Sequence, residues 1–122
     1  VLFSLAATLG ILQYDFEMDL VTQQVDTQAT YLRLGDQVQG VSFPGEPLTR
    51  TGMAVKGVMR APYRVVMGNT GDALGYFILA DEWQTGRNDD YEEGVSLGEG
   101  AGARAVEVLT ELVLGDDFVM RD

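Results

Sequence analysis

The 122-residue chain is long enough for one domain with a buried core, since 46% of its residues are hydrophobic and 9% are aromatic. Its formal net charge is −11, from 19 acidic and eight basic residues, and such a field repels a phosphate backbone. Nucleic acid is therefore excluded as a partner, and binding to anionic membranes is disfavoured, although an apolar lipid can still enter a pocket.

The chain contains neither cysteine nor histidine. Without cysteine, disulfides and thiolate metal sites are excluded. Histidine is the usual general base near neutral pH and the commonest metal ligand, so its absence restricts the chemistry further. Any reaction that this chain carries out alone must use carboxylates, hydroxyls, tyrosine or arginine.

Residues 1–12 form an apolar stretch, VLFSLAATLGIL, with no basic residue before it. About a dozen residues are too few to span a bilayer as a helix, and the stretch lacks the charged region of a signal peptide. We expect no stable membrane insertion here. We expect a buried element that continues from upstream sequence, so that residues 1–122 are one domain and a fragment of a larger protein.

Acidic and apolar residues alternate over Asp15–Asp26 with a period close to two, which is typical of half-buried strands. The next runs, Thr30–Leu34 and Val38–Phe43, are separated by a short loop containing Gly35, and this pattern predicts an antiparallel hairpin. Pro44 cannot donate a ladder hydrogen bond, so the second strand should end there.

Apolar positions three and four residues apart predict a helix over Leu48–Met59. Pro47 suits its first position, because the missing N–H would be unpaired there anyway. Glu46 would then lie at the helix N-terminus, where the macrodipole favours an ionised carboxylate. Two interpretations of Glu46 stay open, a charge that only stabilises the helix and a metal ligand held at a strand-to-helix junction.

The run Tyr63–Met67 predicts a buried strand that leads into a glycine-rich loop over residues 68–75. The loop ends at Tyr76, just before a second apolar run, and binding groups favour such junctions. If this strand lies beside Val38–Phe43 in one sheet, Glu46 and Tyr76 converge at one end of it. The alternative for Tyr76 is an amphipathic core residue whose hydroxyl finds a partner at the rim.

Acidic residues gather again over Asp89–Glu93, which begins within a charged link at 86–90. The segment lacks the alternating ligands and central glycine of a helix-loop-helix calcium site. We therefore interpret it as a solvated surface, with a calcium-stabilised domain as the weaker alternative.

The last predicted element is an amphipathic helix over Gly98–Leu114, ended by Gly115, whose small residues suggest tight packing on the core. Residues 116–122 are expected to form a partly ordered tail. The elements together predict a mixed α/β (α+β) fold, with an antiparallel or mixed sheet, strand-loop-helix junctions and a C-terminal packing helix.

Three segments stand in a familiar order: Val41-Ser-Phe-Pro-Gly-Glu46, Gly68-Asn-Thr-Gly-Asp-Ala-Leu-Gly-Tyr76 and Tyr91-Glu-Glu-Gly-Val-Ser-Leu-Gly98. In order and spacing they resemble the C-terminal part of the catalytic domain of the neutral/alkaline non-lysosomal ceramidase family, which includes many prokaryotic relatives. The resemblance covers the chain from Tyr31 to Leu114.

The resemblance implies an enzyme that hydrolyses the amide bond of ceramide with a zinc ion, held by two histidines, a glutamate and a tyrosine. The glutamate falls on Glu46. The tyrosine falls on Tyr76, which is therefore both an expected metal ligand and the expected catalytic residue. Asn69, Asp72 and Tyr91 are expected to brace the loop or to support the ligands without touching the metal.

The family's histidines lie earlier in its chain and have no counterpart here. Two protein ligands are short of the three that a catalytic zinc site needs, so we expect zinc only in the complete protein and no activity from this chain alone. The expected partners are the upstream part of the same protein and a lipid-like N-acyl substrate, in sphingolipid or other lipid metabolism. The alternative is a non-catalytic ceramidase-like binding or structural module that has lost the metal site. It is motivated by the missing histidines and by Gly71, which stands where relatives of that family often carry asparagine.

Overall fold

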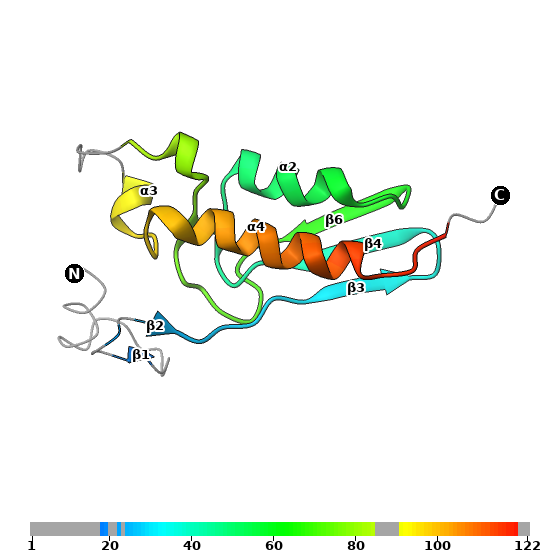
Figure 1. The fold of residues 1–122 in the computed structure, drawn as a ribbon, viewed down its shortest axis with the longest axis horizontal. Coiled ribbons are helices and arrows are strands. Elements are labelled where there is room, and N and C mark those ends of the chain that lie inside the picture. Colours follow the sequence, from blue (N-terminus) through cyan, green and yellow to red (C-terminus); the bar gives the residue numbers. More distant parts are fainter. Residues whose placement is uncertain (1–17, 20–21, 23, 85–90, 120–122) are drawn as a thin grey trace.

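The computed structural model describes residues 18–19, 22, 24–84 and 91–119, arranged as Figure 1 shows. The predicted apolar element at 1–12 and the charged link at 86–90 lie outside the described residues. Within the alternating acidic segment, β1 (Met18–Asp19) and β2 (Gln24–Val25) form a small antiparallel pair. This pair comes before the strands of the central sheet in the chain.

The central sheet has three strands in the order β3-β4-β6. The first two, β3 (Tyr31–Leu34) and β4 (Val38–Ser42), form the predicted antiparallel hairpin. The third strand, β6 (Tyr63–Met67), runs parallel to β4. A second, two-stranded parallel sheet is formed by β5 (Glu46–Pro47) and β7 (Tyr76–Phe77).

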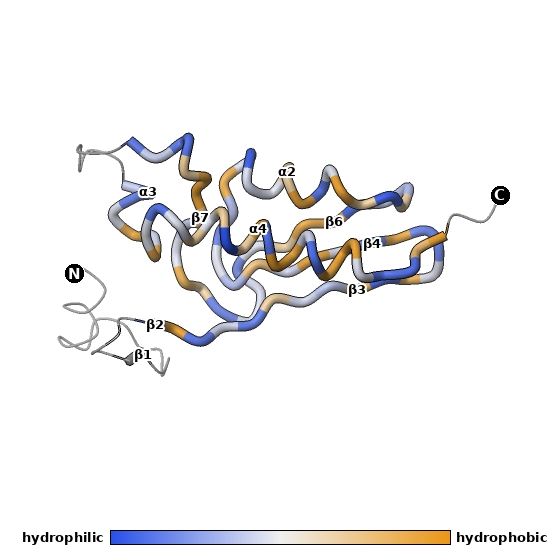
Figure 2. The backbone as a smooth tube through the Cα atoms, viewed as in Figure 1, coloured by the Kyte–Doolittle hydropathy of each residue, from blue (hydrophilic) through white to orange (hydrophobic). Residues whose placement is uncertain are grey.

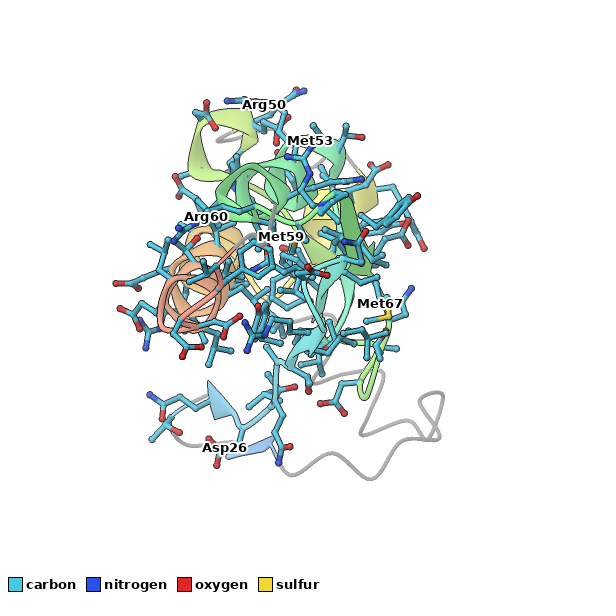
Figure 3. The ribbon with its side chains drawn as sticks, turned by 90° about the vertical axis from the view of Figure 1, so that its right-hand side faces the viewer. Asp26, Arg50, Met53, Met59, Arg60 and Met67 are labelled. Carbon is cyan, nitrogen blue, oxygen red and sulfur yellow. The ribbon has the colours of Figure 1, made fainter. Side chains whose placement is uncertain are left out.

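Two helices cover one face of the central sheet, as Figures 1 and 3 show. They are α2 (Thr49–Val58), between β5 and β6, and α4 (Glu99–Leu114), which packs against α2. A short 3-10 helix, η1 (Ala80–Glu82), and the single turn α3 (Tyr91–Gly94) belong to the segment before α4. The predicted mixed α/β class, with its C-terminal packing helix, is confirmed.

The hydrophobic core lies between the sheet and the two helices. Val41 and Phe43, from β4 and its end, meet Val55 of α2 and Leu109 of α4, and all four are fully buried. Figure 2 shows how apolar and hydrophilic residues alternate along α4, as an amphipathic helix requires. In the described part of the chain, no helix combines the length and the apolar character needed to cross a membrane.

The start of α2 corrects the prediction that placed Pro47 in its first turn and Glu46 at its N-terminus. The helix begins only at Thr49. Glu46 and Pro47 lie in β5 instead, and the pairing continues because the N–H of Leu48 donates to the carbonyl of Phe77 at 3.1 Å. That bond holds Leu48 extended, and the helix can start only after it.

The predicted buried strand at Tyr63–Met67 is only half correct, since β6 is at the edge of the sheet and is covered on one face. Val66 packs against the core. Its neighbour Val65 is 42% exposed and Tyr63 is 66% exposed, because alternate residues of a strand point to opposite faces.

The segment after α4 is anchored where the sequence predicts a partly ordered tail. The ring of Phe118 is buried, with 4% exposed. Asp116 accepts a hydrogen bond from the Tyr31 hydroxyl at 2.5 Å and lies 3.4 Å from Nε of Arg33. Residues 120–122 lie outside the described part of the chain.

A buried amide joins this anchor to the rest of the sheet. Gln39, with 1% exposed, donates through Nε2 to the Tyr31 hydroxyl at 2.9 Å. Its Oε1 accepts the N–H groups of Arg60 at 2.6 Å and of Ala61 at 2.9 Å. Both ends of the buried side chain are therefore hydrogen-bonded, as buried polar groups require.

We expect this network to give the chain a pH dependence of stability in the alkaline range. Partial burial and the hydrogen bond to Asp116 raise the pKa of Tyr31 above its ordinary value of 10.0. The folded chain then holds the phenol proton more tightly than the unfolded chain, so the stabilisation is complete below pH 10 and is lost as the pH rises further. Urea unfolding from about pH 8 to about pH 11 should therefore show a steeper alkaline loss in the wild type than in Tyr31→Phe.

At neutral pH the same substitution should lower the free energy of unfolding by about 1–3 kcal/mol, since a hydrogen bond to a charged group is lost. Tyr63→Phe is the matched control, because its ring is largely exposed. Identical alkaline slopes in the wild type and Tyr31→Phe would contradict this account.

Candidate functional site

The parallel pairing of β4 and β6 brings two chain segments to the same edge of the central sheet. Ser42 and Met67, the last residues of the two strands, are register partners. From there β4 leads through Pro44 and Gly45 into β5, while β6 leads through the glycine-rich loop into β7. In open α/β sheets, ligands bind outside the carboxyl ends of the strands, which is where these segments lie.

Glu46 and Tyr76 are register partners in the β5–β7 pair. The N–H of Glu46 donates to the carbonyl of Gly75 at 2.9 Å, which fixes the register next to both residues. Register partners in a sheet direct their side chains to the same face, so a carboxylate and a phenol stand side by side. The predicted convergence is observed, whereas the ligand roles of both residues stay predictions.

Close backbone approach under this pair depends on Gly45. A Cβ at this position would lie 2.4 Å from the carbonyl oxygen of Gly75 and 2.6 Å from the ring of Phe77. The same Phe77 ring packs edge to face on Phe43, with centroids 5.9 Å apart. The packed rings of Phe43 and Phe77 therefore lie against the strand pair that carries Glu46 and Tyr76.

Backbone hydrogen bonds hold the glycine-rich loop against the segment that precedes β5. Asn69, with a positive φ of 51°, donates its N–H to the carbonyl of Gly45 at 2.7 Å. Leu74 donates its N–H to the carbonyl of Pro44 at 2.9 Å. Asp72 accepts a hydrogen bond from the hydroxyl of Thr27. The structure thus places Asn69 and Asp72 in contacts that brace the loop.

Tyr91 contacts Tyr76 directly. The two rings meet edge to face, with centroids 6.0 Å apart and an interplanar angle of 74°. Tyr91 is itself 70% exposed, so its ring forms an outer wall beside the phenol. Ser96 forms a parallel β-bridge with Tyr76, a contact that no motif in the sequence indicates because it depends on the path of the chain after α3.

The environment of Tyr76 favours its neutral phenol. Desolvation raises the pKa of Tyr76 above 10.0, and the nearby charge of Glu46 raises it further, with Tyr91 and Glu92 contributing after that. A carboxylate close to a phenol acts in this direction because two adjacent negative charges repel each other. In the absence of a cation, the Tyr76 phenol is therefore a potential hydrogen-bond donor close to the Glu46 carboxylate.

A groove of about 340 Å³ begins at Glu46 and follows α2. Its lining is mostly apolar and includes Pro47, Met53 and Val66. The side chain of Lys56 contributes one positive charge to it. Figure 3 shows Met53 on the outer side of α2, where it is 58% exposed. The groove was not predicted from the sequence, although Met53 and Lys56 lie one helical turn apart and could have indicated a second face of the helix.

A larger hollow, of about 610 Å³, lies at the opposite end of the strands. It is lined by the β3–β4 turn and the segment after α4, including Arg33, Asp36 and Asp117. Size alone would favour it, but ligand sites in layered α/β domains lie at the carboxyl ends of the strands. The smaller groove beside Glu46 is therefore the better candidate.

The described residues do not form a complete metal site by themselves. Among the described residues, no group of three or more histidine, cysteine, aspartate or glutamate side chains could hold a metal ion. Glu46 and Tyr76 match two of the four ligands that the resemblance implies. A carboxylate oxygen is a regular zinc ligand, and a phenol oxygen beside it can complete half of a tetrahedral set.

The acidic segment near Tyr91 gives no sign of a cation site in its described portion. Glu93 accepts a hydrogen bond from the N–H of Gln84 through Oε1. Asp89 and Asp90 lie outside the described residues, so the calcium alternative stays a prediction.

Comparisons with protein-family models, with curated proteins and with solved structures find no match to this chain.

Proposed function

We propose that this chain is the C-terminal part of a zinc-dependent amidohydrolase similar to the neutral ceramidases. Glu46 and Tyr76 provide two oxygen ligands, and histidines from the upstream part of the same protein complete the site. The observation that carries the proposal is the register pairing of Glu46 with Tyr76 across β5 and β7. Two strand-loop junctions distant in the sequence deliver the two groups to the same place.

The arrangement suits amide hydrolysis in three respects. A zinc ion bound there would lower the pKa of a coordinated water and polarise the amide carbonyl. Glu46 is an exposed carboxylate on the β5–β7 strand pair and would hold the cation there. Tyr76, steadied by the edge of the Tyr91 ring, either binds the metal or donates a hydrogen bond to the oxygen of the substrate carbonyl, where negative charge develops.

The apolar groove along α2 favours a substrate with an N-acyl chain. It begins at Glu46, so an amide held beside the carboxylate would extend its acyl chain between Pro47, Met53 and Val66. Apolar walls of this kind bind a hydrocarbon chain through burial, at about 0.8 kcal/mol for each CH₂ group removed from water.

The second candidate is a non-catalytic ceramidase-like module, and the absence of histidine from all 122 residues favours it. In that case the paired Glu46 and Tyr76 are remnants of a site, and the upstream part also lacks metal-spaced histidines. The two candidates differ in one measurable property, which is zinc binding by the longer protein.

In the full-length gene product, we expect Glu46→Gln to weaken zinc binding by more than about tenfold and to abolish hydrolysis of N-acyl substrates. The amide keeps the size of the side chain but removes the anionic donor. Because Glu46 is exposed, the free energy of unfolding of the zinc-free protein should change by less than about 0.5 kcal/mol. Zinc titration, an amidase assay and urea unfolding measure these effects.

Glu111→Gln is the matched control, since it removes one exposed carboxylate on α4, away from the β5–β7 pair. It should leave zinc binding and activity unchanged. Full activity in Glu46→Gln would remove Glu46 from the site. A fall in stability without any change in zinc binding would assign it a purely structural role.

A further inference from the structure

Strand β6 leaves one backbone edge unpaired among the residues that the structure describes. It is the last strand in the order β3-β4-β6. The N–H of Tyr63 donates to the carbonyl of Gln37 at 3.0 Å, so the ladder to β4 uses Tyr63 and every second residue after it. The N–H and carbonyl groups of Arg64 and Val66 therefore point away from β4. We call these four groups the free edge.

The free edge lies in a part of the chain without acidic residues. The chain has 19 of them, but none between Glu46 and Asp72, where four of its eight basic residues stand. Arg64 is exposed and shares with Val66 the face of the sheet that the helices cover. Lys56 of α2 lines the groove together with Val66. Within the described part of the chain, neither Arg64 nor Lys56 has an ion-pair partner.

The opposite face of β6 presents apolar side chains. Tyr63 is 66% exposed and Val65 is 42% exposed. A strand added along the free edge would therefore meet positive charge on one face and apolar surface on the other. Because side chains alternate between the two faces of a strand, a segment of alternating acidic and apolar residues complements both.

We propose that the free edge binds an extended acidic segment of a partner protein, which adds to the central sheet as a fourth strand. In this mode of recognition, main-chain hydrogen bonds give affinity and alternate side chains give specificity. The acidic side chains would lie beside Arg64 and Lys56, and the apolar ones beside Tyr63 and Val65. The inference does not rest on the proposed zinc site and concerns the groove only at its Lys56 end.

A second copy of this chain is a poorer occupant. Pairing β6 with the β6 of another copy would bring two Arg64 side chains close together, and charged side chains on edge strands discourage such pairing. The net charge of −11 on each copy opposes it as well. An acidic segment instead brings the charge that Arg64 and Lys56 lack.

The probe is a fluorescently labelled peptide of about eight alternating valine and glutamate residues, the length of an ordinary strand. Anisotropy titration with the 122-residue chain should show saturable binding that weakens as salt is raised. A peptide with lysine in place of glutamate should not bind. Methylation of alternate peptide nitrogens keeps the charge but removes N–H donors, and it should weaken binding by at least about tenfold.

Hydrogen exchange locates the bound peptide on the sheet. The amides of Arg64 and Val66 should become at least about tenfold slower to exchange when the peptide is bound, because their N–H groups gain acceptors. The amide of Val65 already belongs to the ladder with β4, so it should change much less.

Arg64→Gln should weaken binding of the glutamate peptide by about two- to fivefold, as expected for an exposed ion pair. Arg104→Gln is the matched control, since it removes an exposed cation from α4 and should leave binding unchanged. No saturable binding would overturn the proposal, as would binding without added protection at Arg64 and Val66. Protection that grows with protein concentration in the absence of peptide, with a doubled mass by light scattering, would overturn it in favour of a second copy.

Discussion

Gly102→Ala should lower the free energy of unfolding by about 3 kcal/mol or more. Gly102 lies near the start of α4, where the helix meets the segment after β7. A Cβ there would stand 2.0 Å from the carbonyl oxygen of Ile78 and 2.5 Å from its carbonyl carbon. Because both atoms belong to the backbone, no side-chain rotation relieves the clash, and α4 must move away from the core.

Gly100→Ala is the matched control for this prediction. Gly100 lies in the first turn of the same helix, and no atom lies within 4 Å of the position that the added methyl group would take. Replacing an open helical glycine by alanine should raise stability by about 0.5–1 kcal/mol. Urea unfolding of both variants measures the difference, and equal small effects would show that α4 does not approach Ile78 this closely.

Gly45→Ala should have an effect of similar size and should also disrupt the candidate site. The added methyl group would meet the carbonyl oxygen of Gly75 at 2.4 Å and the Phe77 ring at 2.6 Å. The Phe77 ring is packed on Phe43 and has little room to move. We therefore expect β5 and β7 to separate, with a loss of about 3 kcal/mol in the free energy of unfolding.

Hydrogen exchange at the amide of Glu46 reports on this separation, because that N–H donates to the carbonyl of Gly75. Protection of the amide should fall in Gly45→Ala beyond the fall that the lower global stability explains. Gly57→Ala, at an open position in α2, should leave the protection intact and raise stability slightly. Unchanged exchange at Glu46 in Gly45→Ala would contradict the close approach.

The parts of the fold that depend on local pattern could be predicted from the sequence. The β3–β4 hairpin follows from two strand-like runs around Gly35, and α4 follows from apolar spacing that ends at Gly115. The convergence of Glu46 and Tyr76 also followed, because it requires only that two neighbouring strands leave the sheet at the same edge. The ligand roles that the resemblance assigns to them stay predictions.

Features that depend on distant partners could not be predicted. A proline before a helical pattern is typical of the first helical position, yet Pro47 lies in β5 because β7 offers it a partner far along the chain. Tyr63 and Val65 look like core residues in an apolar run, but periodicity does not tell which face of a sheet is covered. Gln39 is polar and nevertheless buried in the fold, because the Tyr31 hydroxyl and two backbone amides satisfy it.

Zinc content tests the central claim most directly, namely that this chain holds half of a metal site. The full-length gene product and the 122-residue chain are purified in parallel, and bound metal is measured by mass spectrometry. The account predicts about one zinc ion per chain in the full-length protein, in line with a site of three or more protein ligands, and none in the shorter chain. Absence of zinc from both would contradict the proposed amidohydrolase and favour the non-catalytic module.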